Sequence, residues 1–193
     1  MTRIGNCAFQ KFNAGIIFTC VLGLIFSYYA YAVEVKKDQD DSYQPLCDIS
    51  EHISCTKVFM TEYGKGFGLF PKDSMFNVRN PIYGLMFYTL VAILSMYSII
   101  VAYVSIHMSY ITITKSFFSG MINNYIFSAA TVILGIISNI FSIYLSHILY
   151  LQRDICVVCI SMYIINVMIT FFAIKKFRQF QKLASDDMYK KVK

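Results

Sequence analysis

The chain has 193 residues, of which 57% are hydrophobic and only 15% are charged. A soluble domain of this size needs charged side chains to solvate its surface, so the balance indicates a lipid membrane as the main environment. The net charge of +6 does not indicate a nucleic-acid partner, because seven of the 17 Lys and Arg residues lie after residue 174. We therefore expect no nucleic-acid binding.

Four stretches without charged residues predict four transmembrane helices, at about residues 13–33, 81–104, 125–150 and 155–174. A hydrocarbon core about 30 Å thick needs about 20 apolar residues of helix. Inside lipid the backbone must satisfy its own hydrogen bonds, which favours helices over strands. The prediction is an all-α membrane protein, a four-transmembrane-helix bundle. The 47 residues between the first two helices are too few for a separate core, so residues 1–193 form one predicted domain.

The first apolar stretch also has a feature of a secretory signal, because Ala30-Tyr31-Ala32 matches the small-residue pattern of a cleavage site. A cleaved signal has an apolar core of about 7–15 residues, and this stretch is longer. We therefore favour an uncleaved helix.

Basic residues set the expected orientation. Lys175, Lys176 and Arg178 directly follow the last helix, and such clusters stay on the cytosolic side. Residues 175–193 are therefore a predicted cytosolic tail. Segment 34–80 also carries six Lys and Arg, but the tail decides because its cluster abuts the helix. We expect segment 34–80 to form a luminal cap of loops and a short helix, with residues 48–54 as one candidate for that helix.

Topology groups four of the six cysteines. The second and third helices cross the membrane twice, so segment 34–80 and the turn before the fourth helix face one compartment. Cys47, Cys55, Cys156 and Cys159 therefore share a side. Cys7 falls on the opposite side, and Cys20 lies inside the first helix.

Cys156 and Cys159 form a Cys-x-x-Cys pair on one face of the fourth helix. With Asp154 as the expected N-cap, Cys156 lies in the first turn, where free amides and the helix dipole favour a thiolate. A lowered thiol pKa makes one sulfur nucleophilic at neutral pH. The neighbouring thiol can then attack the adduct that this sulfur forms and release it as a disulfide. A disulfide within one helical turn would constrain little, which disfavours a structural role.

The four cysteines could also bind a metal, and the loop pair Cys47 and Cys55 has two possible roles. A Cys₄ zinc site is disfavoured because structural zinc normally holds a small soluble fold together, so no metal is expected. Cys47 and Cys55 either close a small stapled loop or relay electrons between an outside dithiol and the helix pair. Their spacing leaves both readings open.

Several blocks resemble the animal vitamin K epoxide reductase family. They are the loop-cysteine block at residues 46–48 and 53–59, the glycine-rich segment 63–69, the start of the second helix at residues 80–89, and the active-site helix at residues 156–167. The order of these blocks within four predicted spans makes the match far more specific than a lone Cys-x-x-Cys.

The resemblance implies a role for each cysteine. Cys159 would attack the substrate, and Cys156 would be its disulfide partner. Cys55 would exchange with Cys156, and Cys47 with a luminal thioredoxin-like oxidoreductase.

The resemblance also implies a substrate pocket. Asn80 and Tyr163 would hydrogen-bond the quinone or epoxide oxygens, and Phe59, Phe87 and Val158 would line the apolar wall. The plainer alternatives are that Asn80 caps the second helix and that Tyr163 is an ordinary buried tyrosine with a satisfied hydroxyl.

The implied activity is thiol-dependent reduction of vitamin K 2,3-epoxide to the quinone and of the quinone to the hydroquinone. Vitamin K is then a substrate, and no tightly bound cofactor is expected. Lys190 and Lys191, at the fourth and third positions from the end, match a dilysine retrieval signal, which predicts a multi-pass endoplasmic reticulum membrane protein with a luminal active site. The alternatives are a quinone-coupled disulfide-forming oxidase of the same family and a non-catalytic tetraspan scaffold.

Overall fold

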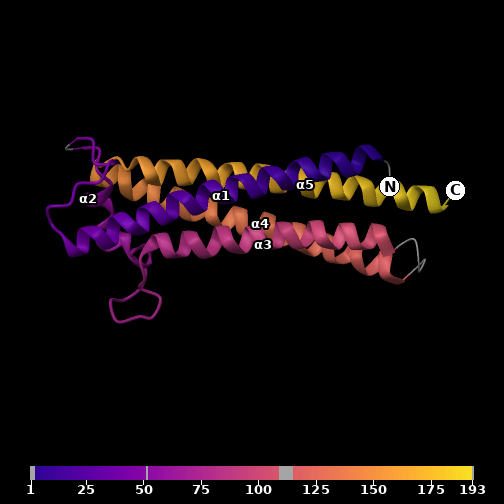
Figure 1. Cartoon of the computed structure of the whole chain (residues 1–193), viewed down its shortest axis with the longest axis horizontal. Helices are drawn as coiled ribbons and strands as arrows, with labels where there is room; N and C mark the ends of the chain where they lie inside the picture. Colours follow the sequence, from indigo (N-terminus) through magenta and orange to yellow (C-terminus); the bar gives the residue numbers. More distant parts are fainter. Residues whose placement is uncertain (1–2, 51, 109–114, 193) are drawn as a thin grey trace. The chain divides into compact units, whose positions relative to one another are not determined.

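The structure, a computed structural model, describes residues 3–50, 52–108 and 115–192. Four long helices dominate it (Figure 1): α1 (Arg3–Gln39), α3 (Asn80–Met108), α4 (Lys115–Gln152) and α5 (Val157–Val192). Three short elements lie between α1 and α3: α2 (Cys55–Phe59), η1 (Glu62–Gly64) and η2 (Gly66–Gly68). Within the described ranges the β-structure is limited to isolated bridges.

Each long helix contains a stretch that is long and apolar enough to cross a membrane, at Gln10–Gln39, Asn80–Tyr97, Tyr125–Gln152 and Val157–Lys182. Each stretch overlaps one of the predicted spans, so the predicted fold class is confirmed. Residues 109–114 of the connection expected between the second and third spans lie outside the described residues, as does the side chain of Cys7.

The helices continue beyond the predicted spans. α1 runs on through charged residues to Gln39, with Lys36 and Lys37 in its last turn, where cations interact favourably with the helix dipole. α5 likewise extends past residue 174 to Val192. Apolar runs mark where lipid begins and ends, whereas a helix ends only where its hydrogen-bonding pattern is interrupted.

The chain divides into two compact units, and each contains a segment of every long helix. The first unit comprises residues 1–20, 90–137 and 167–193. Aromatic pairs connect its helices: the ring centroids of Tyr97 and Phe127 lie 4.8 Å apart, and those of Tyr125 and Phe177 lie 5.3 Å apart. Such pairs add to the packing between helices in lipid, where the hydrophobic effect does not drive association.

The second unit comprises residues 21–89 and 138–166 and holds all the short elements. Its helices share a buried polar chain, in which Tyr88 Oη donates to Asn166 Oδ1 at 2.9 Å and Asn166 Nδ2 donates to Ser142 Oγ at 2.9 Å. Gly23 permits close packing, because a Cβ there would lie 2.6 Å from the Tyr88 ring. These bonds join α3, α5 and α4 and fix which faces of the helices meet.

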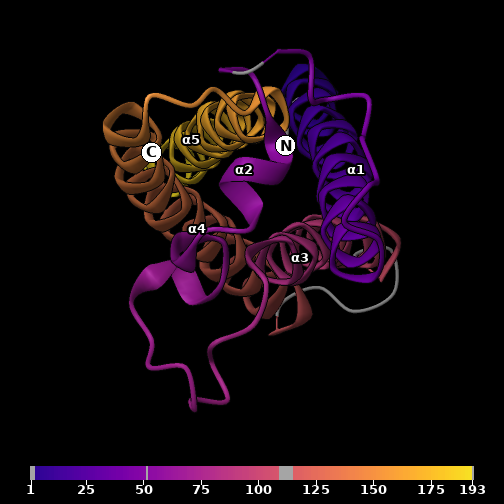
Figure 2. The ribbon, with the colours of Figure 1, turned by 90° about the vertical axis from the view of Figure 1, so that its left-hand side faces the viewer.

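The short helix of the cap does not lie where we expected it. Among the described residues of 48–54 none is helical: Ser50 and Ile53 form an isolated bridge, and α2 begins only at Cys55. Ser54 caps α2, because its side chain accepts a hydrogen bond from the amide of Lys57 at 3.2 Å. In Figure 2, α2 lies among the ends of the four long helices.

Candidate active site

The loop cysteines form a closed disulfide, with 5.8 Å between the Cα atoms of Cys47 and Cys55. Cys47 is 7% exposed and Cys55 is fully buried. An oxidised loop pair is compatible with both readings of these cysteines, as a staple and as a relay. The difference in exposure gives an outside thiol better access to Cys47.

Backbone pairing brings this loop to the start of α5. Ile53 and Ile155 form a parallel bridge, in which the Ser54 amide donates to the Ile155 carbonyl at 3.0 Å and the Ile155 amide donates to the His52 carbonyl at 2.9 Å. Cys55 and Cys156 therefore follow directly from two paired segments. These four cysteines lie in one buried cluster. The cluster is consistent with the prediction that they share one side of the membrane.

Cys156 occupies the cap position of α5, which begins at Val157. Its Sγ accepts a hydrogen bond from the Cys159 amide at 3.2 Å, so the expectation that Asp154 caps this helix with Cys156 inside the first turn is wrong. The reason is local: Arg153 takes a left-handed conformation with φ 58°, and Ile155 is occupied by the bridge. The chain therefore becomes helical two residues later than we expected.

The environment of Cys156 favours its thiolate. Cys156 and Cys159 are free thiols, and Cys156 precedes the apolar span of α5. A hydrogen bond from the Cys159 thiol lowers the pKa of Cys156, and backbone amides of Cys159 and Val158 add to this against the opposing effect of burial. A sulfur that accepts amide hydrogen bonds at the start of a helix is stabilised as a thiolate. Because its thiol pKa is low, it is also a good leaving group in disulfide exchange.

A cavity of about 50 Å³ lies beside Cys159. Three of the predicted pocket residues, Phe59, Asn80 and Tyr163, line it together with Cys159. Small-molecule sites usually measure roughly 300–1,000 Å³, so a quinone ring can enter only if part of the wall moves.

Two predicted pocket residues lie elsewhere. Val158 is buried in the cysteine cluster, and the Phe87 ring packs edge-on against Tyr88 with 5.2 Å between centroids. Neither lines the cavity, so their contribution to substrate binding stays a prediction.

One wall of the cavity comes from residues that the sequence did not single out. They lie on α4 and α5, and comprise Leu145, Ile148, Leu149, Gln152 and Met162. The helical spacing of the four α4 residues places them on one face, which was the available signal. That face could not be assigned to the pocket without knowing how α4 is rotated.

Asn80 begins α3, but its side chain bonds to the glycine-rich segment (residues 63–69). Its Oδ1 accepts from the Phe67 amide at 2.9 Å, and its Nδ2 donates to the Tyr63 carbonyl at 2.6 Å. An amide nitrogen carries two N–H groups, so one remains available to a ligand oxygen in the cavity. Tyr163 supplies a second candidate donor, because its hydroxyl makes no hydrogen bond to any residue in the described ranges.

Cys47, Asp48 and Cys55 are close enough together to raise the question of a metal site, with their ligand atoms within 4.8 Å of one another. The two sulfurs are joined as a disulfide and so are not thiolate ligands. The Asp48 carboxylate is also engaged, since it accepts hydrogen bonds from Ser54 and Thr56. This group therefore fits a hydrogen-bonded loop better than a metal centre.

Comparison with known proteins identifies the family. The model of the vitamin K epoxide reductase family matches residues 15–174. The vitamin K epoxide reductase complex subunit 1 of Mus musculus is 32% identical over 162 residues, which cover 81% of this chain and 85% of the mouse protein. The Rattus norvegicus protein of the same name is 30% identical over the same shares. The chain therefore belongs to the vitamin K epoxide reductase family.

Proposed function

We propose that this protein reduces vitamin K 2,3-epoxide to the quinone and the quinone to the hydroquinone, with its own thiols as the reductant. The observation that carries the proposal is the position of Cys159, which lines a cavity and lies one helical turn from the Cys156 thiol. Asn80 and Tyr163 supply polar groups to the same cavity. The family resemblance supports the choice of substrate.

The two reductions balance with one dithiol each. The Cys159 thiol passes its proton to the Cys156 sulfur along the hydrogen bond that joins them. The Cys159 sulfur then forms a bond to a ring carbon of the substrate, while an epoxide C–O bond or the quinone C=C π bond breaks. The Cys156 sulfur next gives up its proton toward the substrate oxygen and attacks the Cys159 sulfur. That sulfur–carbon bond breaks, two electrons remain on the substrate, and a Cys156–Cys159 disulfide forms. From the epoxide, two protons leave with the oxygen as water; the quinone instead takes both protons as its hydroquinone.

Asn80 and Tyr163 would act on the substrate oxygen. Negative charge develops on that oxygen as electrons arrive, and donors placed in a site with little water stabilise such charge strongly. The available N–H of Asn80 and the Tyr163 hydroxyl are therefore assigned as its hydrogen-bond donors.

The same cluster supports a route for regenerating the dithiol. The Cys55 thiolate would attack the Cys156 sulfur, after which Cys47 would complete the loop disulfide. A luminal thioredoxin-like dithiol would then reduce the loop pair through Cys47, the more exposed of the two. A closed loop disulfide beside a free helix pair is the state in which this route leaves the enzyme ready for substrate.

We assign the protein to the endoplasmic reticulum membrane, with the four cysteines on the luminal side. The basic residues after residue 174 support a cytosolic tail. An oxidising lumen is also where disulfide exchange of this kind operates.

Replacement of Cys159 by Ala tests the proposal. We expect Cys159→Ala to abolish dithiol-dependent reduction of vitamin K epoxide and quinone in detergent. Cys20→Ala is the matched control, because Cys20 is also a free buried thiol, belongs to the first unit and is not a member of the cysteine cluster. Full activity in Cys159→Ala would refute the scheme.

The closed loop disulfide also favours a second function, in which the loop pair oxidises folding proteins and the quinone accepts the electrons. Reduced client protein, supplied with quinone and no other oxidant, separates the two. Faster turnover with the client than with a small dithiol would favour the oxidase.

A further inference from the structure

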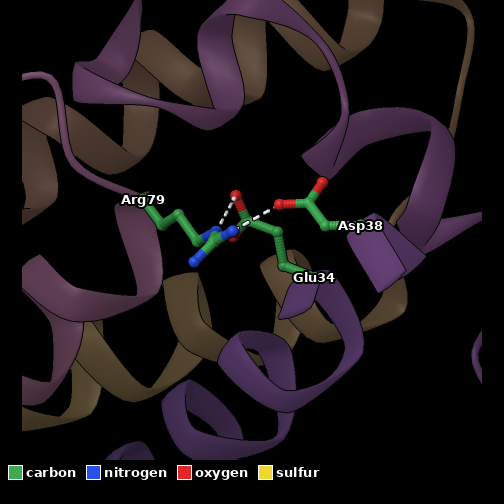
Figure 3. Close-up of polar contacts among 3 residues, drawn as sticks. All are labelled: Glu34, Asp38 and Arg79. Atoms are coloured by element: carbon green, nitrogen blue, oxygen red, sulfur yellow. Dashed lines mark hydrogen bonds and ion pairs between the residues drawn. The ribbon is translucent and has the colours of Figure 1, made fainter. Parts of the chain in front are cut away.

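A charge cluster lies between α1 and the residue that precedes α3. Glu34 is fully buried, and its Oε1 lies 3.3 Å from Arg79 Nε. Asp38, one turn further along α1, contacts Arg79 Nη2 (Figure 3). The two acids are four residues apart and so project from one face of α1 toward a single guanidinium.

Glu34 depends on Arg79. A buried carboxylate is costly unless it is paired, and neither Glu34 oxygen has a hydrogen-bond partner among the described residues. The contact with Arg79 is its only ion pair in the described part of the chain. Loss of the guanidinium would leave an uncompensated buried charge, which is a large perturbation.

The backbone of Arg79 is tied to the wall of the cavity. Arg79 forms a bridge with Lys65, and the Gly66 amide donates to the Val78 carbonyl at 2.8 Å. The next residue is Asn80, whose side chain forms hydrogen bonds with the backbone of Tyr63 and Phe67. One residue therefore connects α1, the glycine-rich segment and a proposed substrate donor.

We propose that Arg79, clamped by Glu34 and Asp38, is a positioning residue that sets Asn80 and the glycine-rich segment at the cavity wall for quinone binding. The proposal rests on the proposed function for its substrate. Arg79 lines no part of the cavity, so it acts through Asn80 and not by touching the quinone. It therefore governs substrate binding more than the thiol chemistry.

The decisive variant is Arg79→Gln in the full-length protein in detergent. Its matched control is Lys72→Gln, which removes an exposed ion pair with Glu62 (3.0 Å) from the same loop. The first measurement needs no substrate: hydrogen exchange in a peptide covering residues 63–69, which contains the Phe67 amide held by Asn80. We expect exchange to be about tenfold faster in Arg79→Gln and unchanged in Lys72→Gln.

The second measurement separates positioning from general stability. We expect Arg79→Gln to raise KM for the quinone by between about tenfold and a hundredfold, with a much smaller change in kcat. In an Asn80→Ala background the same substitution should change KM little, because the residue through which it acts is gone. Arg79→Lys should recover part of the loss, since it restores the charge but not the fork of the guanidinium.

Each outcome decides something. Unchanged exchange in Arg79→Gln, or an equal rise in KM with and without Asn80, overturns the proposal. Faster exchange in a protein that reduces no quinone keeps the positioning role and rejects the proposed function. If Arg79→Gln does not fold, Asp38→Asn removes one ion pair and leaves Glu34 paired; we expect an intermediate rise in exchange there, and no rise overturns the proposal.

Discussion

Replacement of Gly64 by Ala is a severe test of how the glycine-rich segment lies against α2. A Cβ at this position would lie 2.0 Å from the carbonyl oxygen of Phe59 and 2.8 Å from its carbonyl carbon. Both atoms belong to the backbone, so no side-chain rotation can relieve the overlap. An ordinary contact begins at 3.4 Å, so the segment must move by more than 1 Å from Phe59.

That movement falls on the cavity, because Phe59 and Gly64 both line it. A displacement of about 1 Å in groups that position a substrate can cost about a hundredfold in rate. We expect Gly64→Ala to raise KM for the quinone on that scale and to lower Tm. The assay is quinone reduction over a substrate series, with thermal unfolding of the same preparation.

Gly15→Ala is the matched control for this prediction. The nearest atoms to its Cβ would be those of the Phe172 side chain, at 3.3 Å, in the first unit. A small side-chain adjustment suffices there, so KM should stay unchanged. Wild-type KM and Tm in Gly64→Ala would refute the close packing on which the prediction rests.

Two further predictions concern the loop and the turn beside the cysteines. Although burial opposes it, hydrogen bonds from Thr56 and Ser54 lower the pKa of Asp48 below its ordinary value. A carboxyl with a depressed folded pKa stabilises the fold above its unfolded pKa, and this contribution is lost as pH falls through the folded value. Tm should therefore decline below about pH 4 and should decline less in Asp48→Asn; equal decline in both proteins contradicts the assignment. Arg153 holds φ 58°, which glycine adopts without strain, so Arg153→Gly should raise stability by about 1 kcal/mol in denaturant unfolding. A loss of stability there would show that the Arg153 side chain contributes more than its backbone strain costs.

The four spans and the grouping of the cysteines were predictable because both follow from simple constraints. Lipid requires long apolar runs, and two crossings of the membrane return the chain to the side it left. Neither inference needs to know how a helix is rotated. The pairing of the cysteines into a closed loop disulfide and a free helix pair was not predictable from spacing, because both states of the loop pair are chemically reasonable.

The errors lie where local contacts compete. Asp48 accepts hydrogen bonds from Ser54 and Thr56, which composition alone does not reveal, and the described residues of 48–54 are not helical. Helix α5 begins later than predicted because Ile155 pairs with Ile53 in a bridge between distant segments. Val158 directly precedes Cys159 on α5 but does not line the cavity, because successive helical residues point about 100° apart. Its contribution to substrate binding stays a prediction.

The bridge between Ile53 and Ile155 is made by main-chain atoms, and this has a consequence for how the protein tolerates change. Side chains at these two positions can vary without altering the alignment of Cys55 with Cys156, because the amides and carbonyls remain. Chain length is different: one residue inserted between Ile53 and Cys55, or between Ile155 and Cys156, would shift one sulfur relative to the other. The site is therefore tolerant of substitution at the bridge and intolerant of insertion beside it.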